Sequence, residues 1–273
     1  GFEDAPKIDI SQIMNYEVMK HSLITQLIPV AGNEDMLANI PHKQIEDLAL
    51  VYRFSVGRDE HGQSTILVKN DMLDRYGITA EQLHEDAMMS APQIEAPSMK
   101  TLFETTAEIM GEDFIELMGE VEPAMPGVYV CTNESKHHGA SVLMYPDFMD
   151  EVADKLGGDF YIIPSSIHET LLFPAKDVEN YHDLEAMVRE VNETQVAPEE
   201  RLSDNVYHYD AEAKVFELAQ HHEERIADME KDSGDRGEKA SVLKDLTAKS
   251  KEVAEKAPKE HAAPKKSRAE EAL

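Results

Sequence analysis

The order of the short apolar segments after residue 127 is the feature that most constrains the fold of this chain. Four runs rich in β-branched and aromatic residues and two amphipathic runs follow one another as strand, strand, helix, strand, strand, helix. The expected strands are VYVCTN, ASVLMY, DFYIIPSS and HETLLFPA, and the expected helices are DFMDEVADKLG and DLEAMVREVNETQ. Because connections this short join antiparallel neighbours, we expect an α+β fold in which helices pack on a mixed, mainly antiparallel sheet.

A fourteen-residue pattern occurs twice, first as VYRFSVGRDEHGQS and further along the chain as VYVCTNESKHHGAS. Both copies begin with Val-Tyr, end with His-Gly-x-Ser and are followed by a helical pattern. Gly62 and Gly139 fall in the polar turn, where glycine adopts a positive φ at little cost. We therefore interpret both copies as hairpin-helix units that arose by common geometry or by duplication.

The N-terminal segment IDISQIMNYEVMKHSLITQLI carries apolar residues at mostly three- and four-residue intervals, which predicts a helix. A short helix is expected after Pro41, and a strand from about Leu48 to Val56 pairs with STILVKN in a hairpin. A last hairpin is expected between NVYHYD and KVFELA. The first part of the chain is thus predicted to combine helices with a single hairpin.

Three further helices are expected between the two copies of the pattern. The segment Asp71–Tyr76 forms the first, and ITAEQLHEDAMMSA forms the second, capped by Thr79 and broken by Pro92. The third is expected within Ser98–Gly119. We divide the chain into a helical and hairpin-helix region at 1–122, an α+β domain packed on it at 123–224, and a disordered tail at 225–273.

The predicted tail and the body differ in composition. The tail is rich in Lys, Glu, Ala, Ser and Pro and has too few apolar residues to bury a core. Residues 226–273 carry 11 acidic and 11 basic residues, so the whole net charge of −29 belongs to residues 1–225. Such a surface repels phosphate backbones, and we expect no direct nucleic-acid binding. Solubility explains the charge most simply; mimicry of a nucleic acid toward a basic partner is the alternative.

We expect that this protein is neither inserted in a membrane nor secreted. No run approaches the roughly 18 apolar residues that cross a bilayer, and the opening GFEDAPKIDI lacks the parts of a signal peptide. Cys131 is the sole cysteine, which excludes an internal disulfide and fits a reducing cytoplasm. The first residue, Gly1, suggests a trimmed or processed start.

Motifs that mark a known chemistry are not found. The chain has no GxxxxGK[ST] loop, no GxGxxG after a strand, no HExxH, no GxSxG and no EF-hand loop. The single cysteine also excludes the usual multi-cysteine zinc sites. We therefore predict no cofactor and no metal, and we expect enzymes of the best-marked classes to be excluded.

The segment PSSIHE offers the first candidate site. Its residues Ser165, Ser166 and His168 provide two hydroxyls and an imidazole at the junction of two expected strands. In the catalytic interpretation, His168 acts as a general base and one of the serines acts as a nucleophile or contacts the substrate. The structural interpretation is a turn whose hydroxyls bond backbone groups, with His168 and Glu169 on opposite faces of the next strand.

Cys131 with His137 and His138 is the second candidate. A catalytic thiolate needs an imidazole in contact, but a lone cysteine in an apolar strand is usually a small buried hydrophobic residue. The pair His221-His222, followed by two glutamates, is a possible metal site, although adjacent histidines on a helix diverge by about 100°. Acidic clusters at 112–113 and 120–122 are possible magnesium ligands, and a solvated face is the simpler interpretation.

Four phrases of the sequence resemble one known family: MNYE at 14–17, IPHKQIEDLALVYR at 40–53, YIIPSSIHETLLFP at 161–174, and MVREVNETQVAPEERLSDNVYHYD at 187–210. They resemble an uncharacterised family of anaerobic Gram-positive bacteria, domain of unknown function 5688, whose members are often associated with mobile elements. The resemblance covers about residues 10–220 and implies a further N-terminal region. It implies no activity, so no site residue is carried over from it.

Three functions are consistent with these observations. The first is a non-enzymatic cytoplasmic interaction or regulatory protein of a mobile element, which binds one or more protein partners through sheet edges, the acidic face or the tail. The second is a hydrolase or transferase with a site near Ser165, Ser166 and His168, joined by Cys131 or His138. The third is an acidic nucleic-acid mimic.

Overall fold

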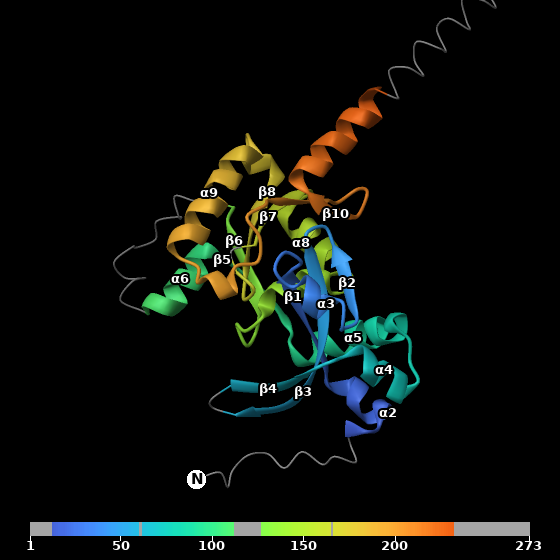
Figure 1. The fold of residues 1–273 in the computed structure, drawn as a ribbon. Helices are drawn as coiled ribbons and strands as arrows, with labels where there is room; N and C mark the ends of the chain where they lie inside the picture. Colours follow the sequence, from blue (N-terminus) through green and yellow to red (C-terminus); the bar gives the residue numbers. More distant parts are fainter. Residues whose placement is uncertain (1–12, 60–61, 112–126, 165, 232–273) are drawn as a thin grey trace, which may run out of the picture. The chain divides into compact units, whose positions relative to one another are not determined.

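The computed structural model describes residues 13–59, 62–111, 127–164 and 166–231 (Figure 1). The described residues up to His222 form one compact unit, and those from Glu223 to Lys231 belong to a second. The first unit contains helices and two β-sheets, which confirms the α+β fold. The pairings are antiparallel, as expected, and the strands divide into two sheets. None of the helices in these ranges is long and apolar enough to cross a membrane.

The first sheet is built around one long central strand. Its strands are β1 (Leu23–Pro29), β2 (His42–Ile45), β3 (Leu48–Asp59) and β4 (Gly62–Leu67). β1 pairs along one edge of β3, while β2 and β4 pair one after the other along the opposite edge. The β3 residues from Leu48 to Tyr52 are all buried, as expected for an apolar run with neighbours on both faces.

Two predicted helices are strands of this sheet. Among the described residues of this segment, Ile13, α2 (Tyr16–Met19) and the 3₁₀ turn Lys20–Ser22 are helical, whereas β1 begins at Leu23. β1 is buried on both faces, so its apolar residues lack the alternation of a half-exposed strand and mimic a helical spacing. The short helix expected after Pro41 is β2, and Glu46, with a left-handed φ of 54°, turns the chain into β3.

The second sheet has six strands in the order β10-β9-β7-β8-β6-β5. Their bounds are Pro97–Thr101 for β5, Tyr129–Asn133 for β6, Phe160–Ile163 for β7, Thr170–Pro174 for β8, Tyr207–Asp210 for β9 and Val215–Leu218 for β10. The hairpin between β9 and β10 is confirmed.

The helix expected within Ser98–Gly119 is wrong at its start. Residues 97–101 form β5, and α6 (Leu102–Met110) begins where Thr101 and Glu104 form a reciprocal capping box. Residues 112–119 lie outside the described residues. The tertiary pairing of β5 with β6 overrides the helical pattern of the segment.

Four other helices form where they are expected: α4 (Asn70–Tyr76), α5 (Ala80–Ile94), α8 (Phe148–Leu156) and α9 (Tyr181–Thr194). Thr79 caps α5 by accepting the Gln82 N–H at 3.2 Å. Pro92 does not break α5, which continues to Ile94, because a proline this close to the end removes only one of its last hydrogen bonds. Gly157 ends α8 with a φ of 84°, as expected of a C-terminal glycine.

The two copies of the repeated pattern fold differently. The first copy forms the predicted hairpin of β3 and β4. In the second copy, β6 is followed by a turn and by the 3₁₀ helix Gly139–Met144, so the expected strand ASVLMY and the second hairpin are wrong. His138, not Gly139, takes the positive φ, at 54°. The shared residues therefore have different roles in the two copies.

Asp47 connects the two sheets at the turn between β2 and β3. Its carboxylate accepts hydrogen bonds from Tyr207, from Ser203 at 2.7 Å and from Asn205 at 3.0 Å. One hydrophobic core includes residues of both sheets, among them Leu50 and Tyr207. The regions predicted at 1–122 and 123–224 thus share a core. Of the predicted tail, residues 225–231 are helical as part of a helix over 219–231, and 232–273 lie outside the described residues.

Candidate functional site

Two turns of the second sheet bring three histidines together. His137 and His138 follow β6, and His168 precedes β8, the strand that pairs with β6. The ring centroids are 4.3 Å apart for His137 and His138, 5.0 Å for His137 and His168, and 5.3 Å for His138 and His168. We call these three residues the first histidine cluster. It brings together His138 and His168, which belong to different segments of the sequence and which the hydrolase or transferase hypothesis places in one site.

Hydrogen bonds define the tautomer of His168. The backbone N–H of His138 donates to Nδ1 of His168 at 3.1 Å, so the ring proton lies on Nε2, which faces Oε1 of Glu200 at 3.5 Å. The hydroxyl of Ser166 accepts the backbone N–H of His168 at 3.0 Å. His168 therefore has no lone pair available for a serine in this arrangement, and Ser166 stabilises its own turn. These contacts favour the structural interpretation of PSSIHE.

His138 is the most perturbed member of the cluster. Its Nδ1 atom is buried and has no hydrogen-bond partner. Burial lowers the pKa of His138 to about 4, and the positive charges of His137, His168 and Arg53 lower it further. At neutral pH this imidazole is therefore uncharged.

Close backbone packing holds the two turns in place. A Cβ atom on Gly139 would lie 2.6 Å from the Asn133 nitrogen and 2.6 Å from the His168 carbonyl oxygen, and it would also collide with Thr132 Oγ1. Thr132 donates to that same carbonyl oxygen at 2.7 Å, and Asn133 bonds both backbone groups of His137. Gly139 is thus required by close approach and not by a positive φ.

The structure separates the other sequence candidates from this cluster. Cys131 is fully buried in β6, and burial raises the pKa of its thiol to about 12, so the thiolate that a nucleophile needs does not form at neutral pH. Ser165 and the acidic clusters at 112–113 and 120–122 lie outside the described residues. His221 forms an ion pair with Glu46 at 2.9 Å and diverges from His222.

A second histidine cluster combines His222 with Asp159 and His208. One ligand atom from each of these three side chains lies within 4.8 Å of the other two. Asp159 precedes β7, His208 lies in β9, and the pairing of these strands places Phe160 opposite Tyr209 and Tyr161 opposite His208. The sequence pointed to His222 but not to Asp159 or His208. The alternation in VYHYD puts His208 on the opposite face from its tyrosine neighbours, but no local pattern connects it to residue 159.

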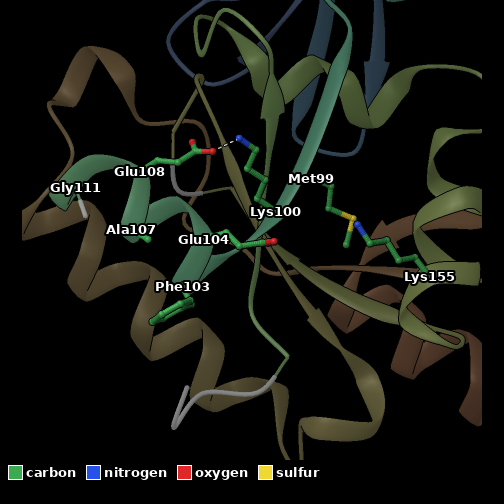
Figure 2. A pocket seen from close by; sticks show the side chains of 8 residues that line it. All are labelled: Met99, Lys100, Phe103, Glu104, Ala107, Glu108, Gly111 and Lys155. Atoms are coloured by element: carbon green, nitrogen blue, oxygen red, sulfur yellow. Dashed lines mark hydrogen bonds and ion pairs between the residues drawn. The ribbon is translucent and has the colours of Figure 1, made fainter. Parts of the chain in front are cut away.

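An open cavity of about 590 Å³ lies beside β5 and α6, the strand and helix that follow α5 (Figure 2). Figure 2 shows Lys100 and Glu108 pointing toward each other as an ion pair, with Met99 and Lys155 near one another in the same pocket. The lining residues are Met99, Lys100, Phe103, Glu104, Ala107, Glu108, Gly111 and Lys155. α6 buries none of its residues, and Ile109 and Met110 are 76% and 61% exposed.

The fold and these sites define an α+β protein of two antiparallel sheets that carries two histidine clusters and an open cavity lined by apolar and charged side chains. The chain belongs to a family of unknown function, DUF5688, whose profile matches residues 2–211. No curated protein and no solved structure gives a match to it.

Proposed function

We propose that this protein is a non-enzymatic cytoplasmic protein that binds a basic protein partner through α6 and the outer edge of β5. The observation that carries this proposal is that α6, which is apolar in sequence, has no buried residue: Ile109 and Met110 are exposed and Phe103 is half-buried. Large exposed apolar surfaces of this kind mark interaction sites in soluble proteins. We call the residues Met99, Phe103, Ile109 and Met110 the α6 surface.

The adjacent strand supplies a second element of recognition. β5 ends the strand order of the second sheet, so in the described part of the chain its outer edge has no strand partner. An extended segment that adds to such an edge bonds its backbone to the strand and places alternate side chains in neighbouring pockets. The cavity beside α6 is in position to receive one of these side chains.

Charge selects the kind of partner. Residues 1–225 carry the entire net charge of −29, which attracts a basic protein and steers its association. The groups that a hydrolase would need are not available for catalysis. Ser166 bonds its own turn, His168 accepts a backbone N–H, and Cys131 is buried. Together these features favour binding over catalysis.

The test compares three forms of the full chain: the unmodified protein, the double variant Ile109→Asp/Met110→Asp, and Met89→Asp. Met89 is a matched control because it is 66% exposed and lies on a different helix, α5. We expect a basic protein that is recovered from host-cell extract with the unmodified and control forms but lost with the double variant. The purified partner should then bind the double variant at least about tenfold more weakly, a difference of about 1.4 kcal/mol.

Two results would overturn the proposal. One is that no recovered protein distinguishes the double variant from the control. The other is a dimer, measured by analytical ultracentrifugation, that the double variant dissociates, because the α6 surface would then be occupied by a second copy of the chain.

A further inference from the structure

We propose that Asp159, His208 and His222 bind a divalent transition-metal ion of the Zn²⁺ type. Two imidazole nitrogens and a carboxylate oxygen form a ligand set that such ions accept, and the three atoms already lie within 4.8 Å of one another. This site is separate from the α6 surface and does not depend on it. It also departs from the absence of a metal that the motifs predict.

His208 is the residue that points most directly to a missing ligand. It is only 2% exposed, and its Nδ1 atom has no hydrogen-bond partner. Its Nε2 atom faces Oδ2 of Asp159 at 3.6 Å, which is longer than a hydrogen bond. A positive ion between Nε2 and the carboxylate would give both of these groups a partner, while Nδ1, on the other side of the ring, takes no part in the site.

The spacing of these two atoms suits an ion. With metal–ligand bonds of about 2.0–2.1 Å and tetrahedral angles, two ligand atoms are separated by about 3.3 Å. The 3.6 Å between His208 Nε2 and Asp159 Oδ2 is close to this value. The other oxygen of the carboxylate, Oδ1, accepts the backbone N–H of Ala211 at 3.0 Å, which directs Oδ2 toward His208.

His222 is oriented by a carboxylate in the way that metal-bound histidines usually are. Its Nδ1 atom contacts Oε1 of Glu217 at 3.2 Å, and Glu217 is itself 7% exposed and lies directly opposite His208 in the pairing of β9 and β10. A carboxylate at Nδ1 holds the ring proton there and leaves the Nε2 lone pair for a metal. Glu217 would therefore act as the orienting partner of the site.

Stacking of the two rings shows what must change on binding. The rings of His208 and His222 lie 3.6 Å apart at an angle of 22°, so their planes are nearly parallel and the lone pairs that lie in these planes do not converge on one point. An ion requires the His222 ring to tilt so that its lone pair points toward Asp159. The His222 side chain is 18% exposed and that of Asp159 is 40% exposed, so water can enter from this side as the fourth ligand.

The chemistry of the ligands selects the class of ion. Mg²⁺ and Ca²⁺ prefer oxygen ligands, whereas imidazole suits Zn²⁺ and its first-row neighbours. A set of two imidazoles and one carboxylate therefore favours Zn²⁺ over Mg²⁺ and Ca²⁺.

The test uses the full chain after treatment with a chelator, titrated with Zn²⁺ in a calorimeter. We expect one ion per chain, and we expect Asp159→Asn and His222→Gln to weaken binding by more than the roughly 10- to 100-fold that loss of an orienting partner causes. Glu217→Gln should fall within that range. Addition of Co²⁺ should produce visible absorption bands that His222→Gln lacks.

Matched controls separate this site from the other histidines. His221→Gln changes the residue next to His222, and His137→Gln changes the first histidine cluster. Both variants should bind Zn²⁺ with an affinity within about twofold of the unmodified chain, a far smaller change than the roughly 10- to 100-fold caused by loss of an orienting partner. Unfolding midpoints measured without metal verify that each variant is folded. Equal Zn²⁺ affinity in all variants, the absence of binding, or equally strong binding of Mg²⁺ would overturn the proposal.

Discussion

The two histidine clusters of this protein lie on the same sheet but use their nitrogen atoms in opposite ways. In the first cluster, Nδ1 of His168 accepts the backbone N–H of His138, and its Nε2 faces Glu200. In the second, Nε2 of His208 stands beyond hydrogen-bond distance of Asp159, whereas an unpartnered Nδ1 is common to His138 and His208. Each contains one imidazole, half-buried His138 and buried His208, whose pKa is lowered to about 4.

This difference shows why proximity of histidines is a weak guide to function. The first cluster is braced by backbone contacts at Gly139 and Thr132, and its imidazoles take part in joining two turns. The second is oriented by carboxylates, with Asp159 and Glu217 each directed at an imidazole. We therefore assign a structural role to the first cluster and propose a ligand for the second.

The largest effect is expected from Gly139→Ala in the first cluster. The added Cβ would lie 2.6 Å from two backbone atoms that cannot move without shifting β6 or the turn before β8. We expect a loss of about 3 kcal/mol or more in the free energy of unfolding, the upper range for overpacking. Urea unfolding measures this loss.

Gly32→Ala is the control. The φ of Gly32 is 81°, but no atom lies within 4 Å of the added Cβ, so this variant should lose only about 1 kcal/mol of unfolding free energy. Equal losses would show that the turns can adjust.

Zinc should stabilise the protein through the second cluster alone. At a free Zn²⁺ concentration of about 100 times Kd, binding to the folded state adds about 2.7 kcal/mol to the free energy of unfolding. Thermal unfolding with and without Zn²⁺ measures this as a shift in Tm. We expect His222→Gln to lose the shift and His137→Gln to keep it. If His137→Gln loses the shift instead, the first cluster is the metal site and the comparison between the clusters is reversed.

Acid should destabilise both clusters by the same mechanism. The pKa of each buried imidazole falls from 6.5 in the unfolded chain to about 4, so the unfolded state binds more protons between these values. Stability is therefore complete above about pH 6.5 and decreases as the pH falls, by at most about 1.4 kcal/mol per pH unit for each histidine.

The measurement is urea unfolding between pH 5 and 7. It compares the unmodified chain, the single variant His138→Asn and the double variant His138→Asn/His208→Asn. Asparagine tolerates the left-handed φ of residue 138. Each substitution should reduce the slope of stability against pH, and the two reductions should add because the clusters are separate. An unchanged slope in both variants would contradict the burial of these rings.

Local patterns predict the parts of the fold that local interactions decide. The strands β6, β8 and β9 and the helices α5, α8 and α9 form as expected, because their amphipathic patterns and caps agree with their tertiary surroundings. β1 and β5 were predicted as helical. One is buried on both faces and the other pairs at the edge of a sheet, and in both cases the pairing outweighs the local preference.

The same reasoning explains which site residues were found. His138 and His168 are close because β6 pairs with β8, and each belongs to a conspicuous polar turn, so both were candidates. Asp159 and His208 are brought together only by the pairing of β7 with β9, across a helix and several turns. No short-range pattern records such a pairing, so the second cluster required the structure.

The smallest effect is expected from Ser166→Ala, which tests the role of the hydroxyl in the first cluster. This change removes one hydrogen bond, from the His168 N–H, and should cost about 0.5–1.5 kcal/mol of unfolding free energy. Ser166→Thr keeps an accepting oxygen and should recover most of the loss. A nucleophile would behave differently, because threonine would not restore activity in a site shaped for serine. A stability loss that Ser166→Thr restores would therefore identify Ser166 as a turn residue, while unchanged stability in Ser166→Ala would contradict a role of this hydroxyl in holding the turn.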